Sequence, residues 1–184
     1  TIINNVALGF ANILNRGNIG IAGASGTGIQ EVTSLLTNAG FGISQAIGTG
    51  GRDLSVRVGG LTMIGALEAL IEDKDTEIIL LISKPPSSEV EDKILDLLKN
   101  CPKPFIINFL GGNVEKSKKR GYKVAKTLEE AARMAMALVK KEEYKKIDFN
   151  DPVEEIKILA EKEYSKFSSD QKYIRGLYSG GSVC

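Results

Sequence analysis

The feature that most constrains the fold is a repeated alternation of short apolar runs with segments of helical periodicity. Residues 77–83 (EIILLIS) have the length of one strand, and their continuous hydrophobicity is typical of a strand buried on both faces of a sheet. The segments between such runs place apolar residues three or four positions apart, as in a helix with one buried face. Strands that alternate with helices pair in parallel, so the sequence predicts an α/β protein.

Five β/α units are predicted. We expect strands at residues 18–23, 42–47, 77–83, 104–110 and 122–125, and helices at residues 28–38, 61–71, 87–100, 114–119 and 127–141. Because crossovers between parallel strands are right-handed, few strand orders are allowed. We therefore expect a flavodoxin-like three-layer sandwich with a five-stranded parallel sheet in the order 2-1-3-4-5.

Composition and charge divide the chain into four parts. We expect an N-terminal linker at residues 1–17, the α/β domain at residues 18–141, and a charged linker with a C-terminal helix at residues 142–172. Residues 173–184 combine an apolar run with a glycine turn and have no partner strand, so they predict the start of a following domain. The chain is accordingly expected to be an excised or truncated piece.

Counts of charged residues, cysteine and histidine exclude several classes of function. The 24 Lys and Arg residues balance 23 Asp and Glu residues, which argues against a nucleic-acid or membrane-surface partner, and no apolar run is long enough to span a membrane. Two cysteines far apart in the sequence fit a cytoplasmic protein without a metal site. The chain contains no histidine, which excludes His-dependent catalytic triads and a phosphohistidine on these 184 residues.

The candidate site follows from the predicted sheet, because ligands of an open parallel sheet bind at the carboxyl ends of its strands. Four predicted strands end in small, polar or cationic residues. Free N–H groups, a helix N-terminus and two cations suit a phosphate or a carboxylate. The expected anion-binding and substrate-binding residues are Ser25, Gly26, Thr27, Gly50, Gly51, Lys84, Gly111 and Gly112, together with Arg52.

Most of these residues also have a structural explanation. Thr27 with Gln30 could cap a helix, and Arg52 with Asp53 could form a salt bridge that holds the glycine-rich loop. Lys84 could be a solvated residue at the end of a strand. An acidic residue such as Glu31 is favoured in a first helical turn by the helix dipole alone.

Several longer motifs are specific when taken together: VALGFAN, GNIGIAGASGTGIQE, AIGTGGRDLS, LISKPP and RGLYSGG. Over nearly the whole chain they resemble the FdrA family of acyl-CoA synthetase-like proteins. More distantly, the chain is similar to the second, flavodoxin-like ligase-CoA domain of the succinyl-CoA synthetase α subunit. The resemblance implies that the Rossmann CoA-binding domain, which precedes this domain in that larger family, is absent here.

The resemblance implies a role for Glu31 and the loss of another residue. In the succinyl-CoA synthetase pattern the glutamate that corresponds to Glu31 holds a phosphohistidine in a GHAG loop, but residues 111–122 of this chain contain no histidine. What remains is recognition of an acyl phosphate or acyl carboxylate, with Arg52 and Lys84 on its oxygens and Glu31 orienting a neighbour. Glu31 and Arg52 are therefore the expected catalytic residues.

FdrA-type proteins are associated with purine and allantoin degradation, which implies a component of an oxamate carbamoyltransferase. A succinate–CoA ligase activity is the catalytic alternative, and CoA or a nucleotide would be used only in the full-length protein. A non-catalytic module that assembles subunits is the other alternative. The resemblance also implies a homo- or hetero-oligomer, and we expect the fragment alone to be inactive.

Overall fold

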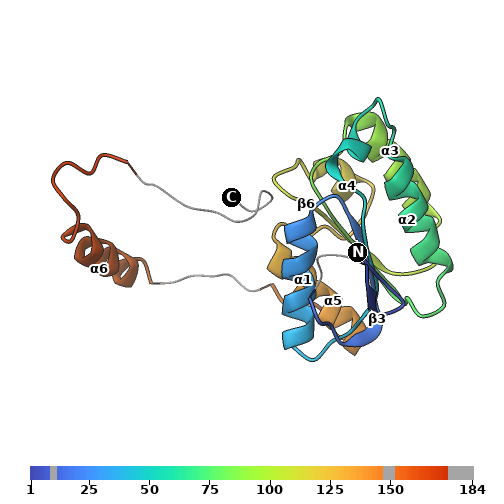
Figure 1. Cartoon of the computed structure of the whole chain (residues 1–184), viewed down its shortest axis with the longest axis horizontal. Coiled ribbons are helices and arrows are strands. Elements are labelled where there is room, and N and C mark those ends of the chain that lie inside the picture. The colour runs from blue at the N-terminus through green and yellow to red at the C-terminus, as the bar shows by residue number, and fades with distance from the viewer. Residues whose placement is uncertain (9–11, 147–151, 174–184) are drawn as a thin grey trace. The chain divides into compact units, whose positions relative to one another are not determined.

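A computed structural model describes residues 1–8, 12–146 and 152–173, which form two units. The larger unit contains Thr1–Tyr144 and is the α/β domain. The second unit contains the helix α6 (Val153–Tyr164). Figure 1 shows the helices and strands of both units.

A six-stranded, mostly parallel sheet forms the centre of the α/β domain. Its strands lie in the order β2-β1-β4-β3-β5-β6. They span β1 (Ile2–Ile3), β2 (Val6–Ala7), β3 (Arg16–Gly23), β4 (Ile43–Gly48), β5 (Ile78–Ser83) and β6 (Phe105–Phe109). The pairs β3/β4, β3/β5 and β5/β6 are parallel, which confirms the predicted order 2-1-3-4 for the four principal strands. The predicted fifth strand is reduced to a single parallel bridge between Ile107 and Val124.

The N-terminal residues contribute a hairpin to the sheet, although the sequence predicted a linker over residues 1–17. Strand β1 pairs antiparallel with both β2 and β4, so the edge of the sheet is mixed. Asn4 and Asn5 both have positive φ, 48° and 64°, as a two-residue type I′ turn requires. Ile2 is buried in the core, and the expectation of a linker is therefore wrong for this segment.

Two layers of helices cover the sheet (Figure 1). Helices α1 (Gly26–Asn38) and α5 (Leu128–Lys140) pack on one face. Helices α2 (Leu61–Glu72) and α3 (Ser88–Lys99) pack on the other. Every residue of β5 is buried, as its continuous apolar run predicted. Thr127 caps α5, because its hydroxyl accepts a hydrogen bond from the Glu130 N–H at 3.0 Å.

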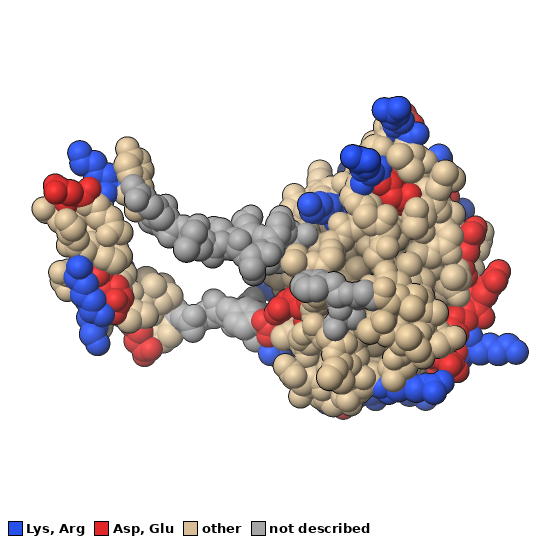
Figure 2. All heavy atoms as spheres, in the orientation of Figure 1, with Lys and Arg blue, Asp and Glu red and all other residues tan. Residues whose placement is uncertain are grey.

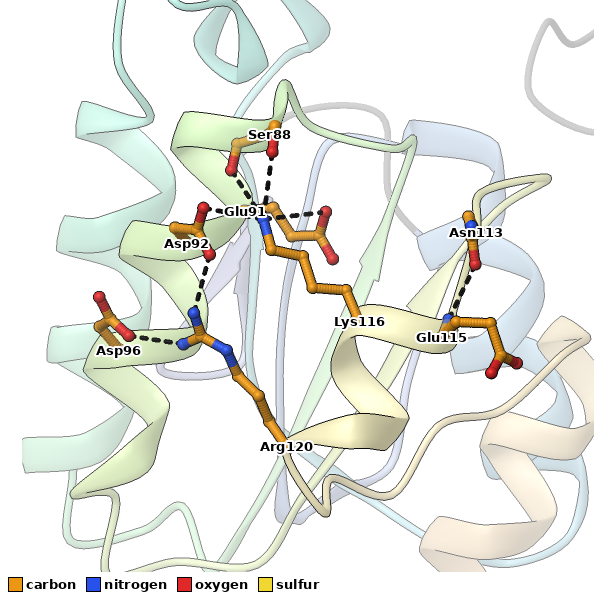
Figure 3. A network of polar contacts seen from close by, with 8 residues as sticks. All are labelled: Ser88, Glu91, Asp92, Asp96, Asn113, Glu115, Lys116 and Arg120. Atoms are coloured by element: carbon orange, nitrogen blue, oxygen red, sulfur yellow. Dashed lines mark hydrogen bonds and ion pairs between the residues drawn. The ribbon is translucent and has the colours of Figure 1, made fainter.

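The short helix α4 (Glu115–Lys119) is held to α3 by a network of charges (Figure 3). Lys116 Nζ lies 2.8 Å from a carboxylate oxygen of Asp92 and 3.9 Å from one of Glu91. Arg120 pairs with both Asp92 and Asp96. Burial raises the pKa of Glu91 above its ordinary value, and the nearby Lys116 only partly offsets that rise. The segment in which the resemblance placed a phosphohistidine loop is thus a compact helical turn anchored on its neighbour.

Helix α6 confirms the predicted C-terminal helix. It begins after Pro152, with Glu154 and Glu155 in its first turn, and none of its residues is buried. The predicted start of a following domain falls on residues 173–184, of which residues 174–184 lie outside the described part of the chain.

Candidate functional site

The loops at the carboxyl ends of the parallel strands are joined at their bases. The Thr49 N–H donates to the Gly23 carbonyl at 2.9 Å, which ties the ends of β4 and β3 together. The Ala24 N–H donates to Ser83 Oγ at 3.4 Å, and the Leu110 N–H donates to the Ser83 carbonyl at 2.9 Å. The structure therefore brings the four predicted loops to one edge of the sheet.

Helix α1 starts at this edge, and its cap is Ser25. The buried Ser25 Oγ accepts a hydrogen bond from the Gly28 N–H at 3.1 Å. The cap needs a glycine at position 28, because a Cβ there would lie 2.5 Å from Ser25 Oγ. The interpretation of Thr27 as the cap is therefore wrong: Thr27 is the second residue of the helix.

Three hydrogen-bond donors at the start of α1 have no acceptor among the described residues. They are the N–H groups of Gly26 and Thr27 and the Thr27 hydroxyl, whose oxygen is buried. The first N–H groups of a helix have no partner within the helix, and the helix dipole makes this end electropositive. No acidic residue lies in the first turn of α1. The arrangement can hold an anion by direct hydrogen bonds.

The N-terminus of α2 shows the contrasting case, because a carboxylate of the same chain occupies it. The two oxygens of Asp53 accept hydrogen bonds from the N–H groups of Thr62 and Met63, each at 2.8 Å. Asp53 is buried with both oxygens on these N–H groups, and it does not form the predicted salt bridge with Arg52. The Arg52 guanidinium is exposed and makes no ion pair within the described residues.

Two cavities open beside the start of α1. The smaller has a volume of about 250 Å³ and lies between α1 and the strands β1 and β4. Its walls are Thr1, Ile2, Asn12, Gly26, Thr27, Ile29, Gln30, Thr33, Ala46 and Gly48. The larger, of about 860 Å³, lies between α1 and α5. Its walls are Asn12, Thr27, Gln30, Glu31, Ser34, Leu110, Lys126, Thr127, Leu128 and Glu129.

The predicted site residues divide into two groups around these cavities. Gly26, Thr27 and Glu31 lie in the walls, and Thr27 is shared by both cavities. The other predicted residues share the edge of the sheet but not the walls of these cavities. They are Ser25, Gly50, Gly51, Arg52, Lys84, Gly111 and Gly112.

Some residues of the second group have a structural role. Gly50 and Gly111 have positive φ, 78° and 69°, which favours glycine. Gly112 lies against Pro85, since a Cβ at position 112 would be 2.9 Å from the proline ring. Lys84 is exposed and forms no ion pair in the described part of the chain.

Exposed cations gather near the same edge of the sheet. Arg52 and Arg57 in the loop after β4, and Lys84 after β5, are all exposed. Figure 2 shows Lys and Arg side chains projecting at the end of the body where that loop lies in Figure 1. Within the described residues no cluster of acidic or cysteine side chains could hold a metal ion. None of the helices described is long and apolar enough to cross a membrane.

Sequence reasoning missed the residues that form the smaller cavity from the side of the hairpin. Asn12 donates hydrogen bonds to the Gln30 carbonyl at 3.3 Å and to Ser34 Oγ at 2.7 Å, which fixes the start of the domain against α1. Ile2 and Ala46 face each other across the β1/β4 pair. The sequence IINNVA could have predicted the hairpin that forms this wall, because an Asn-Asn turn separates two apolar pairs.

The comparison with known families identifies the class of protein. Residues 15–111 match the family described as "CoA binding domain", and the chain belongs to this family. The chain is 44% identical over 185 residues to the "Uncharacterized protein YahF" of Escherichia coli, an alignment that covers 100% of this chain and 35% of that protein.

Other relatives are α subunits of succinate–CoA ligases. It is 34% identical over 111 residues to the α subunit of the ADP-forming succinate–CoA ligase of Aquifex aeolicus, covering 60% of this chain and 35% of the subunit. The corresponding α subunit 1 of Archaeoglobus fulgidus is 30% identical over 107 residues, covering 58% and 35%. The chain thus spans about a third of the length of these relatives.

A solved structure has the same fold. The apo dinucleotide-forming acetyl-coenzyme A synthetase 1 of Ca. Korarchaeum cryptofilum superposes with a TM-score of 0.54 at 19% identity, covering 68% of this chain and 30% of that one. At this identity the likeness concerns the fold alone.

These comparisons confirm the relation to succinyl-CoA synthetase α subunits and the α/β fold. They differ from the sequence resemblance on one point. The resemblance indicated the second domain of that subunit and implied that a CoA-binding domain was missing, whereas the matching family is described as a CoA binding domain.

Proposed function

We propose that this domain holds the phosphate or carboxylate of an acyl substrate at the N-terminus of α1, as part of an acyl-CoA synthetase-like enzyme. The observation that carries the proposal is the group of three free donors, the Gly26 N–H, the Thr27 N–H and the Thr27 hydroxyl. Among the described helices, the carboxylate of Asp53 occupies the first N–H groups of α2, and α3, α4, α5 and α6 each carry acidic residues in their first turn. Helix α1 is the one whose start is capped yet open to an anion.

Fixed donors suit a reaction in which charge develops on a leaving group. When an acceptor attacks the carbonyl carbon of an acyl phosphate, the carbon–oxygen bond to phosphate breaks and negative charge grows on the departing phosphate. N–H groups that are already oriented stabilise this charge without reorganisation. Arg52 and Lys84, at the same edge of the sheet, would strengthen the positive potential. Because the chain has no histidine, we propose direct transfer rather than transfer through a phosphohistidine.

Carbamoyl phosphate is the acyl phosphate that we propose first. Attack by the nitrogen of oxamate on its carbonyl carbon would release phosphate and a proton and would form oxalurate. Glu31 lies in the wall of the larger cavity, where its carboxylate could orient the attacking group or accept that proton. The proposal places the protein in purine and allantoin degradation, in the reducing cytoplasm that its two distant cysteines fit.

Membership of the CoA binding family raises the question of where coenzyme A would fit. The smaller cavity, of about 250 Å³, is too small for coenzyme A. Its walls also carry no charged side chain that could pair with the phosphates of the coenzyme. The groups that suit its phosphates are the free N–H groups of Gly26 and Thr27 and the exposed Arg52 and Lys84. When bound, the coenzyme would supply a thiol as the acyl acceptor, which is the succinate–CoA ligase alternative.

The proposal is tested by titrating carbamoyl phosphate and orthophosphate into the natural full-length protein and its Thr27→Val variant. Loss of a hydrogen bond to a charged group costs about 1.5 to 3 kcal/mol, so affinity should fall about 10- to 100-fold. The melting temperature should stay the same or rise, because the hydroxyl that is removed has no partner.

A matched control is Thr37→Val, which removes the other buried, unpartnered hydroxyl of α1. Thr37 lies at the far end of the helix, so the Thr37→Val variant should leave affinity unchanged.

The Arg52→Ala variant, like Thr27→Val, should weaken binding, with little change in stability because the side chain is exposed. Equal affinities for the wild type and Thr27→Val would reject the site. Assays with oxamate and carbamoyl phosphate, and with succinate, CoA and ATP, then distinguish the two activities.

We also propose that the chain acts within a homo- or hetero-oligomer. Its relatives include proteins named as α subunits, and the exposed apolar side chains of Val56, Val58 and Leu61 lie close together in sequence. Such residues are typical of protein–protein contacts. Analytical ultracentrifugation of the same preparation tests this proposal. A mass above that of one chain supports it, and the mass of a monomer rejects it.

A further inference from the structure

The smaller cavity beside α1 is more apolar than the rest of this edge of the sheet. Ile2 from β1, Ala46 from β4 and Ile29 from α1 line its interior, and all three are buried residues. No charged side chain lies in its walls. The cavity is therefore an apolar recess in an otherwise polar and cationic edge.

This recess is continuous with the proposed anion site. Gly26 and Thr27, which carry the three free donors, also form part of its wall. A ligand whose phosphate is hydrogen-bonded to these donors can therefore extend an apolar chain into the recess. The walls of the larger cavity on the other side of Thr27 instead include three charged residues, Glu31, Lys126 and Glu129.

The volume of the recess limits what it can accept. An apolar cavity of about 150 Å³ binds a molecule of the size of benzene. The volume of about 250 Å³ found here is therefore enough for a short aliphatic chain, but not for the body of a coenzyme.

The absence of a charged side chain from the walls limits the charge of the ligand. Burying a carboxylate without a partner costs several kcal/mol, so the far end of the acyl group must be uncharged. A dicarboxylic acyl group such as succinyl would place its second carboxylate against Ile2, Ile29 and Ala46. We propose that the recess selects a short, uncharged acyl group, an inference that rests on the proposed anion site at α1.

The test uses phosphonates, which carry the anion and the chain without hydrolysing. Orthophosphate, methylphosphonate and propylphosphonate are titrated calorimetrically into the full chain. Each buried methylene contributes about 0.8 kcal/mol, so propylphosphonate should bind roughly tenfold or more tightly than methylphosphonate. 3-Phosphonopropionate, in which a carboxylate replaces the terminal methyl group, should bind more weakly than propylphosphonate by more than about tenfold.

The variant Ala46→Val fills the recess from β4, where a β-branched residue is compatible with the strand. It should abolish the advantage of propylphosphonate and leave the affinity for orthophosphate unchanged. If Ala46→Val does not fold, the phosphonate series on the wild type still decides the question.

The outcomes separate the two proposals. Binding of orthophosphate and methylphosphonate without any gain for propylphosphonate overturns the acyl recess alone. Tighter binding of 3-phosphonopropionate than of propylphosphonate also overturns it, because it shows a charged acyl end. Absence of binding by orthophosphate and by every phosphonate rejects the anion site itself and the recess with it.

Discussion

At the scale of single residues, the aspartate and the arginine of the GGRD loop have separate roles. Asp53 is buried and caps α2, whereas Arg52 is exposed. The sequence indicated that this loop matters but could not separate the two residues. The hydrogen-bond partners of Asp53, Thr62 and Met63, are nine and ten residues away in the sequence. That separation is beyond the range of local capping patterns. Capping by a distant side chain becomes visible only when the fold is known.

The structure therefore predicts that Asp53→Asn destabilises the domain. The variant keeps the size of the side chain but replaces one of the two charged acceptor oxygens by an NH2 group, and a hydrogen bond to a charged group contributes about 1.5 to 3 kcal/mol. Chemical unfolding of the wild type and the variant measures this difference. Arg52→Ala is the control and should unfold as the wild type does. A stable Asp53→Asn variant would contradict the structural role assigned to the aspartate.

At the scale of elements, a partly buried polar cluster fixes the N-terminal hairpin to the rest of the sheet. The Gln45 side chain donates to Asn4 Oδ1 at 3.0 Å and to Asp73 Oδ2 at 3.1 Å. The Thr76 hydroxyl donates to the same oxygen of Asp73 at 2.6 Å. Burial raises the pKa of Asp73, but the hydrogen bonds from Thr76, Asp75 and Gln45 outweigh it, so that the pKa lies below its ordinary value.

This lowered pKa predicts how stability changes with pH. A carboxyl group whose pKa is lower in the folded state stabilises the protein above its unfolded pKa, and this contribution is lost as pH falls through the folded pKa. The difference in unfolding free energy between the wild type and Asp73→Asn should therefore be constant near neutral pH and shrink below about pH 4. Urea titrations at several pH values measure it. A difference that grows on acidification would contradict the assignment.

The same elements show how far the sequence predicts local structure. The continuous apolar runs of β3, β5 and β6 identified these strands to within two residues. The strands β1 and β2 have only two residues each, too few for any alternation to be visible. Residues 122–125 have the composition of a strand but form only the bridge at Val124, because they lie at the edge and pair on one side alone.

At the scale of the whole molecule, the strand order could be predicted because right-handed crossovers allow few alternatives. That order also placed the four loops at one edge, where the candidate site lies. The cavities could not be predicted, since their walls combine α1 with the unexpected hairpin and with α5, segments far apart in the sequence. Among the predicted site residues, Gly26, Thr27 and Glu31 therefore gain a defined place in a cavity wall, and the sequence alone could not distinguish them from the others.

The central claim is that the first N–H groups of α1 bind the anion of the substrate, and backbone amide NMR tests it most directly. Orthophosphate is titrated into the ¹⁵N-labelled 184-residue chain, and the shift of every assigned amide is followed. We predict that the largest, saturable shifts are those of Gly26 and Thr27, and that Thr27→Val reduces them. Shifts confined to the loops of Arg52 and Lys84, or no saturable shift at all, would contradict the account.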